Sequence, residues 1–338
     1  MYAIEVNDLT KSFGDLMAVD HICFSVSQGE IFGFLGPNGA GKTTTTRMLT
    51  CISTPTEGSA QIMGNDIQKQ AFAAKEQMGV VTDISNVYLD LSAQENLIFT
   101  GKLYGLSKDR RLQKAKELLE LFGLQDVRHE IVRGFSGGMK RRLTIAMALV
   151  NDASVLFLDE PTTALDVQSV RVIHELIMKL NSSGTTIFLT THNMAEASSL
   201  CNRVAIISQG RIATVDTPER LKQAMDRVHS VEVVFESSSS HLVKDLEELQ
   251  GVRGVQKRGN MLRLLTLHPP EVLTGVFQYS ERKDLRLLSI NTLGPSLEDV
   301  FLEMTGEEIV ERPKGSGKSS ERRGSVKSRR SSHLFNWD

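Results

Sequence analysis

A chain of 338 residues is longer than one compact core usually needs, so we expect two domains and a tail. Hydrophobic residues make up 40% and charged residues 24%, which is ordinary for a globular protein and excludes disorder throughout the chain. The formal net charge of -2 gives no broad positive field, so nucleic acid is not an expected partner.

The cysteines and the hydropathy indicate the compartment. Cys23, Cys51 and Cys201 are far apart and show no C-x-x-C spacing, so we interpret them as reduced residues rather than as ligands or disulfides. No run reaches the ~18 apolar residues that span a bilayer, and residues 1–8 lack the features of a signal peptide. The sequence therefore predicts a cytoplasmic protein that does not itself cross the membrane.

The first predicted elements are two antiparallel strands. From Ala3 to about Phe24 apolar positions alternate with polar ones, and Gly14 and Asp15 mark a turn between the strands. Phe13 lies next to this turn.

A glycine-rich loop follows the apolar run from Ile31 to Leu35 and opens a predicted helix from Lys42 to Cys51. In a strand-to-helix turn, glycines allow the close approach and backbone angles that point several N–H groups and a helix N-terminus at one anion. Lys42 would reach the β- and γ-phosphates of a nucleotide, and the Thr43 hydroxyl would bind Mg²⁺. The pattern predicts phosphate binding, since a chance glycine-rich turn rarely has this spacing. The loop consists of Gly36, Pro37, Asn38, Gly39, Ala40, Gly41, Lys42, Thr43 and Thr44.

The next 140 or so residues predict a parallel sheet with helices on both faces. Apolar residues at three-and-four spacing indicate helices from Ser92 to Gly123. We therefore expect an α/β fold in which a helical block, at about 84–150, is inserted between two halves of the sheet. The predicted elements around this block are strands at 58–63, 78–81, 155–158 and 186–189 and a polar helix at 68–77.

The pattern changes from about Val228. The predicted order is strand, helix, strand, strand, helix, strand, which is a ferredoxin-like α+β unit with one appended helix from Ser296 to Met304. This C-terminal domain, at 227–306, shows no metal spacing and no nucleophile beside a base. A regulatory or dimer-contacting role is therefore favoured over a catalytic one.

The last segment, 307–338, is rich in Ser, Gly, Lys and Arg, and we expect it to be a disordered basic tail. The simplest role is a solubilising end. Alternatively, its basic residues contact anionic lipid, at about 1 kcal/mol each, while Leu334, Phe335 and Trp337 enter the interface.

Two further motifs carry chemistry. A predicted strand at 155–158 ends in Asp159 and Glu160, and consecutive side chains at a strand end point to opposite sides. One carboxylate can therefore bind Mg²⁺ while the other binds a water, and the phosphate loop disfavours a merely solvated acidic strand end. Ser136 precedes Gly137 and Gly138 at a predicted helix start, which leaves bare amides as a second anion site.

Together these motifs resemble the nucleotide-binding subunit of an ATP-binding cassette (ABC) transporter over about residues 1–226. The resemblance implies a P-loop NTPase cassette with a parallel sheet core, antiparallel N-terminal strands and an inserted helical subdomain. Within the family, the stretches 135–143, 191–197 and 297–306 are similar to exporters of the daunorubicin and multidrug resistance (ABC-2) type. The matching parts, in the family's order, are Phe13, the loop 36–44, Ser136-Gly137-Gly138, Asp159-Glu160, Ala164-Leu165-Asp166 and His192.

The resemblance assigns roles around ATP. Phe13 stacks on adenine, for which the alternative is a half-buried strand aromatic. Asp159 and Thr43 hold Mg²⁺, and Lys42 binds the phosphates. Glu160 polarises the attacking water, and His192 contacts the γ-phosphate as transition-state charge develops.

The resemblance also implies a composite site. The segment Ser136 to Gly138 reaches the ATP of a second subunit. Asp166, in the matching stretch Ala164-Leu165-Asp166, is a further nucleotide-binding residue that the resemblance implies. One chain thus holds two half-sites, and a competent enzyme is a homodimer or a paired cassette.

Asp83 departs from the family's pattern. The family has a Gln after the strand that corresponds to 78–81, and that Gln touches Mg²⁺ and water. A carboxylate about 6 Å from a phosphate charge costs roughly 3 kcal/mol at an effective dielectric of 20 unless the metal offsets it. We therefore expect Asp83 either to act through Mg²⁺ or to turn away.

The function implied is ATP hydrolysis that energises a separate integral membrane permease, with the chain peripheral at the inner face of the cell membrane. The alternative is a soluble cassette ATPase in translation or nucleic-acid metabolism. Such proteins carry tandem cassettes or a long coiled coil, and this sequence shows neither an internal repeat nor sustained heptads. The transported substrate would be selected by the permease.

Overall fold

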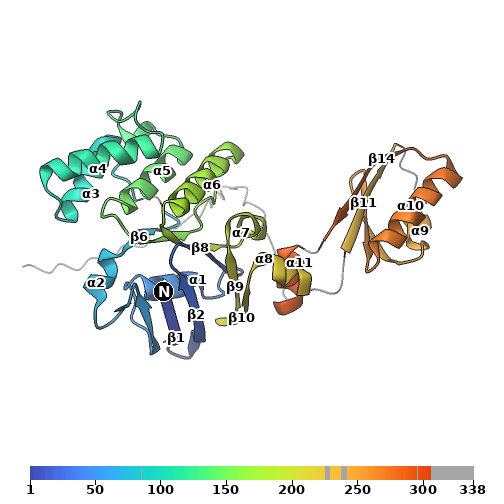
Figure 1. Ribbon diagram of the computed structural model, residues 1–338, viewed down its shortest axis with the longest axis horizontal. Coiled ribbons are helices and arrows are strands. Elements are labelled where there is room, and N and C mark those ends of the chain that lie inside the picture. Colours follow the sequence, from blue (N-terminus) through green and yellow to red (C-terminus); the bar gives the residue numbers. More distant parts are fainter. Residues whose placement is uncertain (85, 225–228, 237–241, 295, 306–338) are drawn as a thin grey trace, which may run out of the picture. The chain divides into compact units, whose positions relative to one another are not determined.

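The computed structural model describes residues 1–84, 86–224, 229–236, 242–294 and 296–305 (Figure 1). These residues fall in the unit Met1–Glu307. The predicted tail and its lipid-contacting residues, and the predicted domain boundary at 226/227, lie outside the described residues.

An antiparallel sheet begins the chain. Strands β1 (Tyr2–Phe13) and β2 (Leu16–Ser27) form the predicted hairpin, with the turn at Gly14 in the left-handed region. The sheet order is β2-β1-β4-β5, with β4 at Glu57–Ile62 and β5 at Asn65–Asp66. In β2, the alternate residues Ile22, Phe24 and Val26 are buried, as the period-two pattern predicts. In β1, adjacent residues are buried at Ala3-Ile4 and Leu9-Thr10, where the register between the two strands shifts.

The central sheet has the order β10-β9-β3-β8-β7-β6. All neighbours are parallel except β10 and β9. Every residue of β3, β7 and β8 is buried, as expected for strands covered on both faces. The strands are β3 (Ile31–Leu35), β6 (Met78–Val81), β7 (Val155–Asp159), β8 (Thr186–Thr191), β9 (Arg203–Ser208) and β10 (Arg211–Asp216).

The helical block forms where the sequence predicts it. Three helices pack together in this block, namely α3 (Ala93–Leu103), α4 (Lys108–Leu121) and α5 (Gly137–Ala148) (Figure 1). A 3-10 turn at Val132–Gly134 lies between α4 and α5 in the chain. Ser92, Ser107 and Ser136 cap them by accepting backbone N–H bonds. The remaining helices of this part are α1 (Lys42–Leu49), α2 (Ala71–Glu76), α6 (Val167–Ser182), α7 (Met194–Leu200) and α8 (Pro218–Ala224).

The α+β part has the predicted order of elements. Its sheet, β12-β13-β11-β14, is antiparallel throughout and has its own core, which includes Val231, Leu264 and Val272. Helix α10 ends at Lys283, and Asp284 closes it in the left-handed conformation. The elements are β11 (His229–Phe235), α9 (Leu242–Glu247), β12 (Val252–Arg258), β13 (Met261–Thr266), α10 (Pro269–Lys283), β14 (Leu287–Leu293) and the appended α11 (Leu297–Thr305). None of the helices within the described ranges has the length and apolar character to cross a bilayer.

Candidate functional site

Four neighbouring parallel strands, β3, β8, β7 and β6, end at the same edge of the central sheet. The residues that follow them therefore meet in space although they are far apart in sequence, as in other open α/β sheets. The glycine-rich loop follows β3, His192 follows β8, Glu160 follows β7, and Asp83 lies two residues after β6.

The glycine-rich loop needs glycine for two different reasons. Gly39 and Gly41 have positive φ angles of 88° and 110°. A Cβ on Gly36 would lie 2.3 Å from the Ile207 carbonyl oxygen, and one on Gly41 would lie 2.7 Å from that of Ala18. Gly41 is also the N-cap of α1 and supplies no side-chain cap, so the helix N-terminus is open to an anion.

The loop and the predicted acidic residues line one cavity of about 300 Å³, called the phosphate cavity below. Asp83, Asp159 and Glu160 line it opposite the loop. Of the remaining loop residues, Gly36 and Pro37 provide the carbonyl oxygens that accept hydrogen bonds from Lys42 Nζ at 2.7 and 3.1 Å. The lining residues are Ala18, Asn38, Gly39, Gly41, Lys42, Thr43, Thr44, Arg47, Asp83, Asp159 and Glu160.

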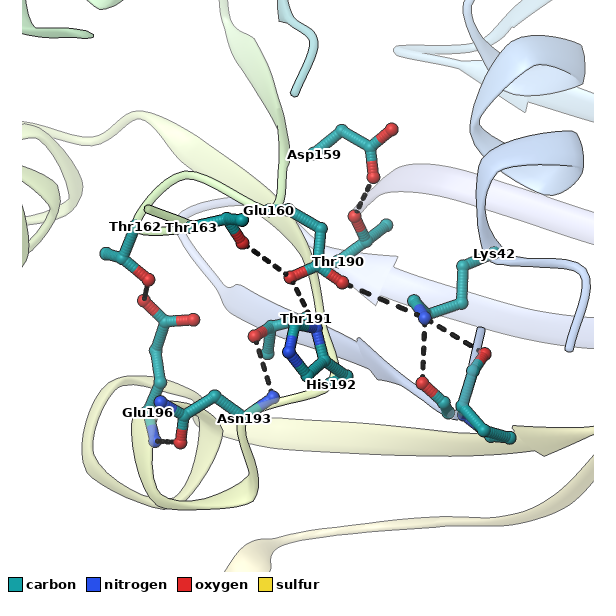
Figure 2. A network of polar contacts seen from close by, with 12 residues as sticks. Lys42, Asp159, Glu160, Thr162, Thr163, Thr190, Thr191, His192, Asn193 and Glu196 are labelled. Carbon is teal, nitrogen blue, oxygen red and sulfur yellow. Dashed lines mark hydrogen bonds and ion pairs between the residues drawn. The ribbon is translucent and has the colours of Figure 1, made fainter. Parts of the chain in front are cut away.

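Lys42 is the cation at the centre of this arrangement. Its Nζ lies 3.8 Å from Glu160 Oε1. Burial lowers the pKa of Lys42, and the carboxylates of Glu160 and Asp159 act in the opposite direction. Figure 2 shows the side chains of Lys42, Glu160 and His192 converging on one another.

Asp159 and Glu160 have different surroundings. Asp159 is buried and accepts a hydrogen bond from the Thr190 hydroxyl (Figure 2). Glu160 has a left-handed backbone, with φ at 47°, which costs a residue other than glycine about 1–2 kcal/mol. Its Oε2 lies 2.8 Å from His192 Nδ1. The two neighbouring carboxylates can therefore serve different ligands.

Arg141 was not predicted from the sequence as a site residue. Its guanidinium is buried, with 4% of the residue exposed, and donates four hydrogen bonds to main-chain carbonyls. Nη2 donates to Asp159 O at 2.9 Å and to Glu160 O at 3.0 Å, Nε donates to Pro161 O at 2.8 Å, and Nη1 donates to Thr82 O.

Glu196 was also missed. This buried carboxylate accepts hydrogen bonds from the Thr162 hydroxyl at 2.8 Å and lies 3.0 Å from His174 Nε2. Burial acts to raise the pKa of Glu196, but hydrogen bonds from His174, Thr191 and Thr162 outweigh burial and lower it. The network links the segment after Glu160 to the segment after β8 (Figure 2).

The segment Ser136-Gly137-Gly138, called the signature segment below, belongs to a second cluster of residues. Ser136 Oγ accepts a hydrogen bond from Met139 N at 3.2 Å, as predicted for a helix cap. A Cβ on Gly138 would lie 2.3 Å from Ser169 Oγ. Asp166 caps α6 by accepting bonds from Ser169 N and Oγ at 2.9 and 2.8 Å. Among the described residues, neither Ser136, Gly137, Gly138 nor Asp166 lines the phosphate cavity.

Phe13 lies at the end of β1 and is 54% exposed. Lys11 Nζ lies 5.1 Å from the centre of its ring. Phe13 does not line the phosphate cavity in the part of the chain that the structure describes. The ring is available on the surface for stacking.

The cavity suits a magnesium ion that is bound together with phosphate. Thr43, Asp83 and Asp159 present one hydroxyl and two carboxylates to it. Mg²⁺ in nucleotide sites usually takes one or two carboxylates and completes its shell with phosphate oxygens and water. Within the described ranges, no three His, Cys, Asp or Glu side chains form a group that could hold a metal by themselves.

A separate groove of about 580 Å³ lies beside α2, β6 and the end of α3. Three exposed apolar side chains line it, namely Phe72 (78% exposed), Leu103 (67%) and Tyr104 (46%). Exposed apolar side chains that gather in one groove mark a candidate interaction surface.

Comparison with known proteins matches residues 19–163 to the model of the ABC transporter family. The chain is 38% identical over 307 residues to the Nod factor export ATP-binding protein I of Rhizobium sp. (strain N33), covering 91% of this chain and 98% of that protein. It is 33% identical over 306 residues to the daunorubicin resistance ATP-binding protein DrrA3 of Streptomyces coeruleorubidus, covering 90% and 96%. A solved dimeric ATP-binding cassette in a post-hydrolysis state with ADP and Pi is 25% identical, with a TM-score of 0.57, and covers 63% of this chain and 98% of that chain.

Proposed function

Because this chain belongs to the ABC transporter family and is an ATPase subunit of the export type, we propose that it hydrolyses ATP to drive export through a separate integral membrane permease. The observation that carries this proposal is the phosphate cavity, which is lined by Lys42, Asp83, Asp159 and Glu160. A soluble role in translation or nucleic-acid metabolism is not favoured, because the relatives named above are export and resistance proteins.

In this proposal the loop amides and Lys42 bind the β- and γ-phosphates, and the exposed ring of Phe13 stacks on adenine. Thr43, Asp159 and Asp83 would hold Mg²⁺, which supplies positive charge to the phosphate oxygens. Glu160 orients the attacking water and accepts its proton.

His192 completes the catalytic group, because its Nδ1 faces Glu160 Oε2. From this position we infer that the ring contacts the γ-phosphate once the nucleotide is bound. The imidazole then stabilises the charge that develops in the transition state.

We further propose that a second copy of the chain, or a paired cassette, completes the site. Ser136, Gly137 and Gly138 start a helix whose amides are open to an anion, yet they do not line the phosphate cavity of their own chain within the described residues. Asp166 belongs to the same cluster, because it accepts hydrogen bonds from Ser169, and Ser169 lies against Gly138. Two chains in opposite orientation would present each signature segment to the partner's ATP.

The groove beside α2 is our candidate for the permease contact. It lies next to β6, and the strand's end leads directly to Asp83 in the phosphate cavity. An amphipathic helix on the cytoplasmic side of the permease would bury its apolar face against Phe72, Leu103 and Tyr104. Binding there would place the protein at the inner face of the cell membrane and link permease movement to Asp83.

Co-purification of the full chain from membranes tests this function. We expect the tagged chain to recover a multi-spanning membrane protein in detergent, and Phe72→Asp to lose that protein. The control Met178→Asp changes an exposed residue on α6, outside the groove, and retains it. Recovery of ribosomes or nucleic acid in place of a membrane protein would favour the soluble alternative.

We assign the nucleotide-binding domain to 1–226, its helical subdomain to about 84–150, and a regulatory or dimer-contacting domain to 227–306. The separate core of the C-terminal sheet supports this division. Hydrogen exchange of the full Glu160→Gln chain tests it. Protection that appears in 227–306 when ATP forms the dimer supports a dimer contact, and unchanged exchange excludes one.

The basic tail at 307–338 is proposed to contact anionic lipid. It carries a strong excess of basic residues and ends with one Phe and one Trp near the C-terminus. Removal of residues 312–338 should weaken sedimentation with acidic vesicles and leave neutral vesicles unaffected. Equal sedimentation with and without the tail would exclude the contact.

A further inference from the structure

Arg141 connects two parts of the cassette that serve different nucleotides in the proposed dimer. It lies on α5, whose first residues are Gly137 and Gly138 of the signature segment. Its guanidinium donates to main-chain carbonyls at the end of β7 and in the segments that follow β6 and β7. The same side chain therefore joins the signature helix to the chain's own phosphate cavity.

The hydrogen bonds of Arg141 surround the backbone of Glu160. Nη2 and Nε bind the carbonyls of three consecutive residues, Asp159, Glu160 and Pro161. Glu160 in the middle has the left-handed φ of 47°. A residue other than glycine keeps such a conformation only where its surroundings fix it, and the guanidinium fork supplies three of the fixed points.

The fourth hydrogen bond reaches the other side of the cavity. Nη1 donates to the carbonyl of Thr82, which directly precedes Asp83. Carboxylates of Asp159, Asp83, Glu196 and Glu160 all attract the buried guanidinium. Arg141 thus donates hydrogen bonds both to the carbonyl next to Asp83 and to the carbonyl of Glu160.

We propose that Arg141 is a positioning residue that sets the geometry of Glu160 and of the Asp83 segment from the signature helix. The inference rests on the proposed role of Glu160 in hydrolysis. Arg141 itself does not contact the nucleotide in this proposal. Movement of α5 against the sheet would shift both segments together, so the fork transmits the position of one half-site to the other.

Arg142 is a matched control on the same helix. Its Nη1 also donates to two main-chain carbonyls, those of Phe122 and Gly123, at 2.8 and 3.2 Å. These acceptors belong to the end of α4 within the helical block. Loss of Arg142 therefore removes two hydrogen bonds from a guanidinium to main-chain carbonyls without freeing Glu160 or Asp83.

The test compares Arg141→Gln with Arg142→Gln in the full chain. We expect the kcat for ATP of Arg141→Gln to fall by about 10- to 100-fold, because small misplacements of a catalytic group have effects of that size. The KM should stay within about threefold, since the phosphate loop is unchanged. Arg142→Gln should retain kcat within about twofold.

ATP affinity separates positioning from general damage. A fluorescent ATP analogue should bind Glu160→Gln and the double variant Glu160→Gln/Arg141→Gln with dissociation constants within about threefold of each other. A kcat of Arg141→Gln within twofold of wild type would overturn the inference. So would a loss that is confined to KM or to nucleotide affinity.

A second variant guards against misfolding. Arg141→Lys keeps the charge and the aliphatic stem but replaces the planar fork, so it should lose at least about tenfold in kcat with an unchanged melting temperature. Full turnover in this variant would overturn the inference. If Glu160→Gln is inactive while Arg141→Gln is fully active, only the role of Arg141 fails. Full activity of Glu160→Gln would overturn the proposed mechanism itself.

Discussion

Nδ1 of His192 lies 2.8 Å from Oε2 of Glu160, and the same carboxylate is 3.8 Å from Lys42 Nζ through its other oxygen. Glu160 therefore stands between the residue that follows β8 and the lysine that opens α1 (Figure 2). A ligand that enters between Glu160 and either His192 or Lys42 has to replace the contact that Glu160 makes with that residue. This makes Glu160 the first residue to test.

Replacing Glu160 by Gln should reduce ATP turnover by at least about 100-fold, because the amide cannot accept the proton of the attacking water. ATP binding should persist, since Lys42 and the loop are unchanged. The variant should accumulate as an ATP-bound dimer in size-exclusion chromatography. The matched control is Glu117→Gln on α4, which should keep wild-type turnover. Turnover at the wild-type rate in Glu160→Gln would contradict the assignment.

Asp83→Gln should change the magnesium dependence of hydrolysis. The wild-type carboxylate lies in the phosphate cavity, so it needs Mg²⁺ to offset its repulsion of phosphate. We expect the wild type to require more Mg²⁺ and to show a steeper titration than Asp83→Gln. Asp109→Asn, on the exposed first turn of α4, should leave the curve unchanged. Coincident curves for wild type and Asp83→Gln would refute this prediction.

Glu196→Gln should lower the free energy of unfolding by about 1–3 kcal/mol at pH 7, because hydrogen bonds to a buried charged group are lost. The folded-state pKa of Glu196 is lowered from its ordinary value of 4.5. The carboxylate therefore stabilises the fold above that value, and this contribution is lost as the pH falls below it.

Urea unfolding of both proteins between pH 7 and pH 4 measures this difference. It should be constant near neutrality and shrink toward the acidic end. The neighbouring variant Glu175→Gln, at an exposed position of α6, provides the control. A difference that grows on acidification would show that the carboxylate is not stabilising in its ionised form.

Gly138→Ala should disturb the contact between the signature segment and α6. The added Cβ would lie 2.3 Å from Ser169 Oγ and 2.8 Å from Ser169 Cβ, and overpacking of this kind costs about 1–3 kcal/mol. We expect a lower melting temperature and reduced ATP turnover. The double variant Gly138→Ala/Ser169→Gly should recover part of the melting temperature and part of the ATP turnover.

Gly134→Ala is the control for Gly138→Ala, because a Cβ at Gly134 would meet nothing within 4 Å. It should change neither the melting temperature nor turnover. If Gly138→Ala behaves like Gly134→Ala, the contact with Ser169 has no role in the function.

The sequence was informative where a short motif is itself the structure. The glycine-rich loop, the cap at Ser136 and the acidic end of β7 all lie where local patterns predicted them. Their requirements, namely positive φ, a capping hydroxyl or a carboxylate after an apolar run, are met within a few neighbouring residues.

Arg141 and Glu196 could not be found in this way. Arg141 donates to main-chain carbonyls that are 18 to 20 and 59 residues away. Because every residue has a main-chain carbonyl, the sequence does not show which ones accept a hydrogen bond. Glu196 pairs with residues 22 and 34 positions away. For both residues, the sequence shows only a charged side chain on a helix face that the apolar pattern predicts to be buried. That pattern does not predict which groups the charge contacts.

The order of the central sheet also affects how the protein is synthesised. Strand β3 is apolar and buried, and both of its neighbours, β8 and β9, are encoded far downstream. Gly29, just before β3, bonds to a residue 157 positions later. At ribosomal rates of about 5–20 residues per second, β3 has no sheet partner for roughly 10–30 seconds after it leaves the tunnel. During that interval the strand that positions the phosphate loop exposes apolar surface that can aggregate, so mutations that slow folding should reduce yield before they change activity.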